Sequence, residues 1–318
     1  LKILKGALSF SSFYEIGSGL EQRRDFIYLK VNDGQGIYTW IDYNQDGVQD
    51  LNEFEIAQFV DQASYIRVFT PSAEYVNVYS NEFNQGIYWR PERIWSSKKG
   101  ILSFLSKFSN QFRMRVKRKT GFLEANLFNP FDSRINDTNL IQAHSLIRNS
   151  LFFNRTSSIF ASEYRYQVSK SKNLLATGFD GKSISFHELS TRWNIISSFS
   201  WENSFKTELK ESNIDYTTGR NYSIQTNEIT SQFNFQPNTK FRIGVEGKYL
   251  QRQNLPIFGG ENCYHSEIGL NGRLNHPKKG SFQSQIKGVS LIYDGTTNSA
   301  VGFEMLQGLK PGINYIWE

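Results

Sequence analysis

The sequence lacks any long apolar run, and this absence excludes a helical membrane protein. No stretch of about 18 apolar residues occurs in the chain, so no segment can form a transmembrane helix. The mean hydropathy is −0.49. A membrane β-strand needs only about 9–11 alternating residues, however, and a chain of such strands is hydrophilic on average. The lack of a long apolar run therefore does not exclude membrane-spanning β-strands.

Cysteine and proline are also scarce. The single cysteine, Cys263, excludes an internal disulfide and says little about compartment. Only 7 residues are proline, whereas aromatic residues make up 15% of the chain, with 26 Phe and 16 Tyr. A chain this aromatic is not disordered, and 318 residues suffice for one large β domain or two smaller ones.

The charge is not concentrated in any segment. The formal charge is +6 and the pI about 9.2, but the basic residues are spread along the chain, which argues against nucleic acid as a partner. The sequence begins at Leu1 without a signal peptide, so we expect a mature segment or a fragment.

Alternation of apolar and polar residues with period two is the dominant pattern. The odd positions from Phe241 to Tyr249 are mostly apolar, for example, and Arg242, Glu246 and Lys248 lie between them. The same pattern occupies 104–116, 160–168, 193–205, 229–235, 241–249, 268–274 and 282–287. It predicts half-buried β-strands, and segments such as 75–89 are long for a soluble sheet.

Short and long connections alternate between these segments. Short polar turns are expected at 154–158, 236–240 and 275–280, and longer loops near 118–140, 169–183, 210–221 and 251–263. Membrane barrels show this asymmetry, because their periplasmic turns are short and their extracellular loops long. Counting strands places the region 15–74, and also Cys263, on the long-loop side.

Two further features favour a membrane barrel over a soluble β-sandwich with one wet face. The polar positions carry long Arg, Lys, Glu and Gln side chains suited to a hydrated lumen. The apolar positions are rich in aromatic residues, as in interfacial girdles. We therefore predict an all-β fold, an antiparallel transmembrane β-barrel of about 12 or more strands with long extracellular loops. Residues 1–14 would form a barrel strand, 15–74 an extracellular calcium-binding loop region, and 75–318 barrel strands with short periplasmic turns.

The most specific motif is DYNQDGVQDLNE, which has the spacing of an EF-hand-type calcium loop, with Gly47 at its sharp turn. Side-chain or carbonyl oxygens would come from Asp42, Asn44, Asp46, Val48, Asp50 and Glu53. In this scheme Val48 gives its carbonyl, Asp50 binds directly or through water, and Glu53 closes the site with both oxygens. We therefore predict Ca²⁺ as a ligand. The alternative is an acidic surface turn without metal.

The surroundings of this loop do not fit a helical calcium sensor. The preceding segment, GIYTWIDY, has the composition of a strand. The following segment has Phe54, Ile56, Phe59 and Val60 at roughly helical spacing, which predicts an exiting helix. Without a helix on both sides, we expect a structural role in which calcium stiffens an exposed loop.

The sequence contains no convincing catalytic constellation. The four histidines are His144, His187, His265 and His276, which lie far apart and outside any metal motif. We expect His276 in a turn and His187 on a strand surface. A barrel hydrolase built on His187 and Glu188 is the alternative. We predict a protein that is not an enzyme.

Three stretches resemble a group of large outer-membrane proteins of Bacteroidota. They are DYNQDGVQDLNEFEIAQF with the following YIRVFTPSAEYVNVYSN, RWNI with its following strand, and GFEMLQGLKPGINYIWE at the C-terminus. The chain therefore resembles the C-terminal portion of such a protein. In that group one or two more barrel strands and a terminal aromatic follow the last stretch. Ending at Glu318 thus implies truncation.

The resemblance implies location and architecture more than activity. We expect a non-enzymatic component of a larger cell-envelope assembly in the bacterial outer membrane, for secretion, assembly or uptake. Its calcium loop would be extracellular, and its partners would be outer-membrane lipid and other envelope proteins, not nucleic acid. The alternatives are a pore or uptake channel for small solutes and a soluble calcium-stabilised adhesion module. The sequence does not identify the partner proteins or the substrate.

Overall fold

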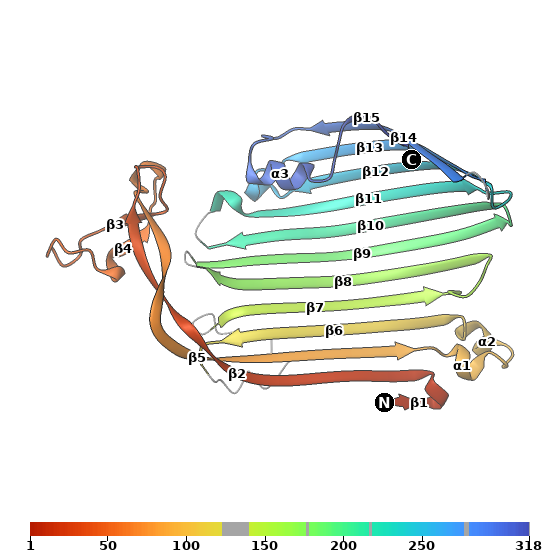
Figure 1. Cartoon of the computed structure of the whole chain (residues 1–318), viewed down its shortest axis with the longest axis horizontal. Helices are drawn as coiled ribbons and strands as arrows, with labels where there is room; N and C mark the ends of the chain where they lie inside the picture. Colours follow the sequence, from red (N-terminus) through yellow and green to blue (C-terminus); the bar gives the residue numbers. More distant parts are fainter. Residues whose placement is uncertain (123–139, 176–177, 216–217, 277–279, 318) are drawn as a thin grey trace.

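A computed structural model describes residues 1–122, 140–175, 178–215, 218–276 and 280–317, and antiparallel strands dominate it (Figure 1). The strands are β1 (Lys2–Ile3), β2 (Leu8–Lys30), β3 (Tyr38–Trp40), β4 (Phe54–Ile56), β5 (Tyr65–Trp89), β6 (Phe108–Thr120), β7 (Leu140–Phe153), β8 (Phe160–Leu175), β9 (Gly178–Ile196), β10 (Phe199–Ile214), β11 (Tyr222–Phe235), β12 (Phe241–Asn254), β13 (Asn262–His276), β14 (Gly280–Tyr293) and β15 (Gly312–Trp317). The helices are α1 (Glu92–Trp95), α2 (Ile101–Leu105) and α3 (Ala300–Leu306), with single 3₁₀ turns at Leu4–Gly6, Leu51–Glu53, Val60–Gln62, Thr218–Arg220 and Pro256–Phe258. Among the described residues, no helix has the length and apolarity to span a membrane.

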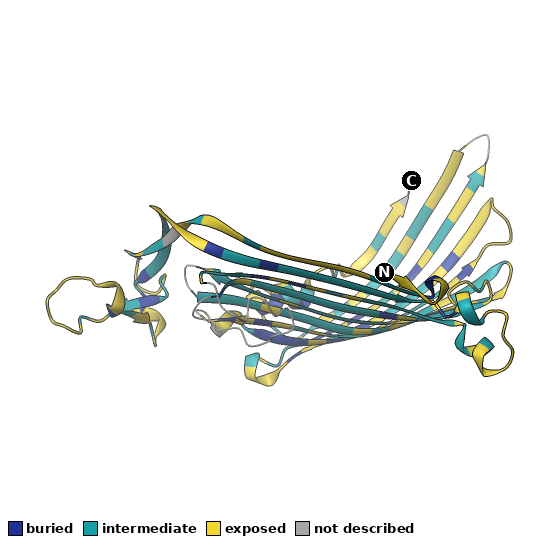
Figure 2. Ribbon diagram, turned by 90° about the horizontal axis from the view of Figure 1, so that it is seen from below, coloured by how far each residue is buried: buried dark blue, intermediate teal, exposed yellow. Residues whose placement is uncertain are grey.

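The strands form one antiparallel sheet in up-and-down order. Its path runs β1-β2-β5-β6 and then through every strand in sequence to β15. The β3–β4 hairpin belongs to the connection from β2 to β5 and lies off this path, with β3 also paired to β5. Figure 2 shows that this sheet is curved like a trough. In the described part of the chain, β2 and β15 do not pair with each other, so the trough is open along these two edges. The expected all-β, antiparallel barrel-type fold is confirmed.

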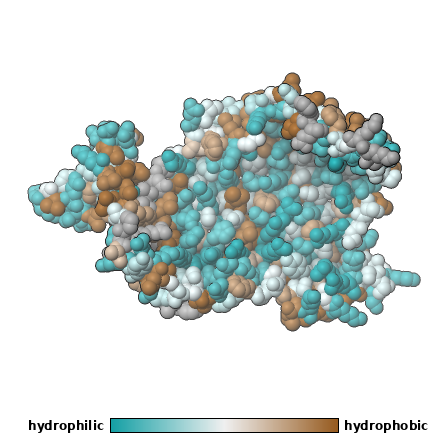
Figure 3. Space-filling model, in the orientation of Figure 1, coloured by the Kyte–Doolittle hydropathy of each residue, from teal (hydrophilic) through white to brown (hydrophobic). Residues whose placement is uncertain are grey.

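The alternation of side chains gives the sheet two different faces. Directly paired residues lie on the same face, so the register groups Arg165 with Glu188 and Lys206. These polar positions cover the concave face, which is turned towards the viewer in Figure 3. We call this face the inner wall. The convex outer face is apolar and exposed: the exposed fraction is 52% for Ile229 and 70% for Ile268.

The connections between strands lie at two ends of the sheet. Segments 31–64, 255–261 and 294–311 lie at one, which we call the loop end. Segments 154–159 and 236–240 lie at the other, which we call the turn end. The strand order therefore places the calcium-type loop and the QPNTK turn at opposite ends, as expected.

The segment 193–205, which we predicted as one strand, contains a hairpin. β9 ends at Ile196 and β10 begins at Phe199, so Ser197 and Ser198 form the connection. Trp193 pairs with Trp201 across it. Because both partners are odd-numbered, the period-two pattern continues through the turn, and alternation alone cannot reveal it.

Three other local predictions are wrong. The loop expected at 169–183 is mostly strand, since β8 continues to Leu175 and β9 begins at Gly178. Its Ser- and Lys-rich sequence lacks apolar alternation, but its backbone still pairs, as between Lys172 and Gly181. The strand expected from residue 104 begins only at Phe108, after α2. Cys263, expected in a loop, is buried within β13.

The helix expected after the calcium-type loop is also absent from the described chain. Phe54–Ile56 is strand β4, which pairs with β3, and Val60–Gln62 is a single 3₁₀ turn. Phe54 stacks on Tyr28, with ring centroids 3.9 Å apart. This contact and the pairing with β3 hold Phe54 in an extended hairpin, so tertiary packing overrides the helical spacing.

The first two long strands extend far beyond their neighbours. β2 pairs with β5 from Leu8 opposite Trp89 to Lys30 opposite Tyr65. β6, in contrast, pairs only with the part of β5 from Tyr79 onward. In the part of β5 that precedes Tyr79, β2 and β5 form a two-stranded ribbon that carries the β3–β4 hairpin (Figure 1). The predicted loop region 15–74 is thus strand at both flanks.

Candidate functional site

The calcium-type loop connects β3 to β4 at the end of this ribbon. Its base is fixed by strand pairing, with Tyr38 opposite Ile56 and Trp40 opposite Phe54. The ring of Phe54 also contacts that of Tyr65, at 5.0 Å between centroids. The loop therefore projects from an aromatic base that holds its two ends together.

The first half of the loop has the turn geometry that the motif predicts. The backbone N–H of Gly47 donates to Asp42 Oδ2 at 3.0 Å, and that of Asp46 donates to Asn44 Oδ1 at 3.0 Å. The N–H of Val48 donates to Asp46 Oδ1 at 2.7 Å. Gly47 has a φ of +70°, a conformation that glycine adopts without strain. Side-chain oxygens thus organise the turn.

Glu53 closes the loop from a buried position, with an exposed fraction of only 2%. Its Oε2 accepts from Trp40 Nε1 at 2.9 Å and from the backbone N–H of Asp50 at 3.3 Å. Asp50 and Glu53 also form a capping box around the 3₁₀ turn. Near them, a hydrogen bond to Glu55 raises the pKa of the Tyr43 phenol. Glu53 is therefore held in place by hydrogen bonds within the loop and its base.

The oxygen atoms of the six predicted ligands are of the type that binds calcium, but they do not surround a single point. Hard oxygen ligands are those that Ca²⁺ prefers, and Asp42 Oδ1 is buried without a hydrogen-bond partner. In the residues that the structure describes, however, no three His, Cys, Asp or Glu side chains converge as metal ligands. The six predicted ligands follow one another as the motif requires, but in the described structure their side chains do not converge on one point.

The inner wall carries a row of alternating charges across seven strands. We call it the charge belt, and it consists of Arg165, Glu188, Lys206, Glu228, Lys248, Glu267 and Lys287, one residue from each strand β8 to β14. Ion pairs join Arg165 to Glu188 at 3.1 Å, Lys248 to Glu228 at 3.2 Å and Lys287 to Glu267 at 2.6 Å. These long charged side chains stay partly exposed, as they would in a hydrated lumen.

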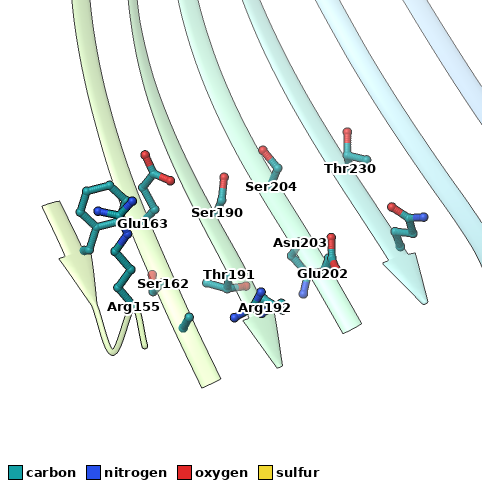
Figure 4. A pocket seen from close by; sticks show the side chains of 13 residues that line it. Arg155, Ser162, Glu163, Ser190, Thr191, Arg192, Glu202, Asn203, Ser204 and Thr230 are labelled. Carbon is teal, nitrogen blue, oxygen red and sulfur yellow. The ribbon is translucent and has the colours of Figure 1, made fainter. Parts of the chain in front are cut away.

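A cavity of about 600 Å³ lies on the inner wall near the turn end. Its polar lining includes Arg155, Glu163, Arg192 and Glu202. Figure 4 shows that Glu163, Ser190 and Ser204 project to the same side from neighbouring strands. The cavity could bind a small polar solute, but it brings together no histidine and no cysteine.

The segment 294–311 folds back over the inner wall at the loop end. Val301 and Met305 of α3 pack into a buried cluster with Ile224 and Cys263. Arg252 Nη1 donates to the carbonyl of Met305 at 2.6 Å. Burying this apolar surface and satisfying the C-terminal carbonyls of the helix both hold α3 against the strands.

Two charged contacts complete the docking of this segment. Lys210 on β10 forms an ion pair with Glu304 of α3. At the start of the segment, the backbone N–H and side chain of Asn262 donate to Asp294, and these hydrogen bonds lower the pKa of that carboxyl. Sequence reasoning missed this arrangement. Its one local signal is Ser299, whose hydroxyl accepts from the N–H of Gly302 and caps α3.

The histidines do not form a site. His187 lies on β9 with its Nδ1 2.7 Å from the Tyr164 hydroxyl, and His265 is buried in β13 on the inner wall. His144 lies on β7, and His276 is the last residue of β13 rather than part of a turn. In the described chain none of them joins a metal-binding group.

The sequence matches no family model and no curated protein. Among solved structures, the chain is similar to a loop L8 deletion mutant of OmpT, an outer membrane protein of Vibrio cholerae. The TM-score is 0.39 and the sequence identity 8%, and the alignment covers 96% of this chain and 97% of that one.

Proposed function

We propose that this chain is part of the wall of a bacterial outer-membrane β-barrel, with its outer face against lipid and its inner wall against water. The observation that carries the proposal is the separation of the two faces. Ile229, Ile268 and other large apolar residues are exposed on the convex side, whereas the charge belt occupies the concave side. A soluble protein rarely exposes so much contiguous apolar surface.

Two neighbouring residues of β11 allow a direct test. Phe233 faces outward and Gln232 inward, since Phe233 pairs with Val245 and Gln232 with Glu246. A nitroxide label at position 233 should be relaxed mainly by oxygen, which concentrates in lipid. A label at position 232 should be relaxed mainly by a water-soluble nickel chelate. Equal access of the chelate to both labels would instead favour the soluble adhesion module.

We further propose that the wall is a non-enzymatic component of a larger envelope assembly. Backbone N–H and C=O groups in a bilayer need partners. Among the described residues, β15 pairs only with β14, and the free side of β2 pairs only with the two residues of β1. Further strands or envelope proteins would therefore complete it. Native electrophoresis after mild detergent extraction should show a complex much larger than the 36.8 kDa chain. Migration at the mass of the chain with its detergent would contradict this proposal.

A pore or uptake channel is the second candidate. The cavity near Arg155 and Arg192 and the exposed charges of the inner wall favour it, because both suit passage of hydrated solutes. Stepwise conductance in a planar bilayer would support a pore. If correctly inserted protein gives no conductance at any voltage, the pore would be ruled out and the assembly role would be favoured.

The loop at residues 42–53 completes the proposal. Its ligand spacing, the buried Glu53 and the unpartnered Asp42 Oδ1 support calcium binding. We propose that Ca²⁺ draws the six ligands together and stiffens the loop, which would lie outside the cell.

A further inference from the structure

Two arginines lie directly opposite each other on the inner wall. Arg113 on β6 is the register partner of Arg148 on β7. Both share the inner wall with Arg115, whose guanidinium is 2.8 Å from Glu82. Like charges placed directly across a sheet destabilise it. This pair therefore differs from Arg165 opposite Glu188, where the same side chain faces a carboxylate.

Among the residues that the structure describes, no acidic side chain neutralises this pair. Glu82 forms its ion pairs with Arg115 and Lys117, and within the described residues no carboxylate forms an ion pair with Arg113 or Arg148. On the flanking strands, the register partners of the two arginines carry no charge. Gly86 of β5 lies opposite Arg113, and Gln167 of β8 lies opposite Arg148. Two arginines are thus directly opposed in the register, and in the described part of the chain neither forms an ion pair.

The position of Arg113 is nevertheless fixed. Its Nε donates to the hydroxyl of Tyr88 at 3.0 Å, and its guanidinium carbon lies 5.7 Å from the centroid of that ring. These contacts orient the guanidinium without cancelling its charge. Arg113 remains exposed and Arg148 half-buried, so a solute on the inner wall can reach both.

The neighbouring pairs show that the sheet does not need arginine here. One step towards the turn end, Gln111 lies opposite Ser150, and one step towards the loop end, Arg115 lies opposite Leu146. Neither pair places two like charges together. Retaining two arginines at the intervening position costs stability, which is expected where a binding function compensates.

We propose that Arg113 and Arg148 form an anion-binding site on the inner wall for solutes that carry a phosphate or another oxyanion. Each planar guanidinium can donate two parallel hydrogen bonds to such a group. An oxyanion between them would neutralise their repulsion. The proposal deepens the proposed function, since it rests on the inner wall facing water.

The test uses inorganic pyrophosphate and the full chain folded in detergent at low ionic strength, where charge interactions are least screened. Arg113→Gln and Arg148→Gln should each weaken pyrophosphate binding at least fivefold in calorimetry, and the double variant should abolish it. Arg165→Gln is the matched control. Arg165 lies on the inner wall opposite Glu188 and already forms ion pairs with Glu163 and Glu188, so its loss should leave pyrophosphate binding unchanged.

Folding stability provides the second readout. Relief of the repulsion should raise the urea midpoint of Arg148→Gln above that of the unaltered chain. A purely structural arginine would give a lower midpoint and unchanged binding, and that result would overturn the proposal. Loss of pyrophosphate binding in phosphatidylglycerol vesicles, but not in detergent, would assign the site to lipid headgroups and overturn the solute class.

The outcomes separate this inference from the proposed function. If the labels at positions 232 and 233 behave as expected and pyrophosphate does not bind, the anion site alone is wrong. If pyrophosphate binds and both labels are equally accessible to the nickel chelate, the membrane-wall proposal is wrong, and the site lies on a soluble sheet.

Discussion

Glu53 serves two purposes with one carboxylate. It accepts hydrogen bonds from Trp40 and from the backbone of Asp50, and it is the predicted bidentate ligand at the end of the calcium-type loop. Replacement by Gln keeps an acceptor oxygen of the same shape but removes the charge. The substitution can therefore separate metal binding from loop folding.

We expect Glu53→Gln to weaken calcium binding by roughly tenfold or more, because the substitution removes the charge and half of a bidentate carboxylate ligand; a tenfold loss corresponds to about 1.4 kcal/mol. Calorimetric titration of the metal-depleted chain measures this loss. Glu55→Gln is the control, since Glu55 contacts Tyr43 and lies outside the ligand set. Absence of heat at millimolar calcium in the unaltered chain would mean an acidic turn without metal.

The depth of an outward residue in the membrane should decide the cost of a charge there. Ile229 lies near the middle of β11 and is exposed on the outer face. Ile229→Arg should lower the free energy of unfolding in lipid vesicles by roughly 2–4 kcal/mol. Ile243, near the turn end of β12, should be more tolerant of the same change, because an interfacial arginine can reach the headgroups.

Gln232→Arg is the control for both variants. Gln232 lies on the inner wall opposite Glu246, so an arginine there should cost little. Urea titrations of the three variants give the ranking. A larger loss for Gln232→Arg than for Ile229→Arg would reverse the assignment of the two faces.

At the scale of the elements, the sequence predicts the strands better than their connections. Alternation identifies the centres of β8 and β11 to β14, because one face of each is apolar and the other polar. It fails at Ser197 and Ser198, where a two-residue turn keeps the parity of the pattern. It also fails where β8 and β9 continue as Ser- and Lys-rich strand, because only backbone pairing holds them there.

The candidate sites divide in the same way. Ligand spacing is a local property, so the order of residues 42–53 follows from the sequence. The charge belt and the Arg113–Arg148 pair depend on cross-strand register, which no local pattern contains. The docking of α3 on Cys263 joins segments about forty residues apart in the chain and could not be predicted either.

Cys263 can report on this docking. It is fully buried beneath α3, so a maleimide should react with it only when the segment 294–311 opens. Arg252→Gln removes the donor to the carbonyl of Met305. We expect alkylation to accelerate by roughly tenfold, which corresponds to about 1.4 kcal/mol of local stability.

Arg242→Gln is the matched control, an arginine on the same strand and face near the turn end, bonded to Asn234. Its rate of alkylation should equal that of the unaltered chain. Equal rates for Arg252→Gln as well would show that Arg252 does not hold the segment in place.

At the scale of the whole molecule, the two ends of the sheet should face different compartments. A cysteine at Gln45, at the tip of the calcium-type loop, should react with an impermeant thiol reagent on intact cells. One at Asn238, in the QPNTK turn, should not react until the outer membrane is broken. Labelling in the opposite order would invert the topology. The native Cys263 is buried, so a Cys263→Ser background only removes slow alkylation.

The ribbon formed by β2 and β5 is a long, two-stranded projection from the wall. About 14 residues of β5, from Tyr65 to Val78, extend past the last partner in β6, a length of roughly 46 Å at 3.3 Å per residue. With only two strands, it resists bending far less than the wall at its base. A hinge rotation of about 10° would carry the tip through roughly 8 Å, by the same strand length. A partner that binds the loop can therefore displace the tip of the ribbon over this distance while the strands of the wall stay in place.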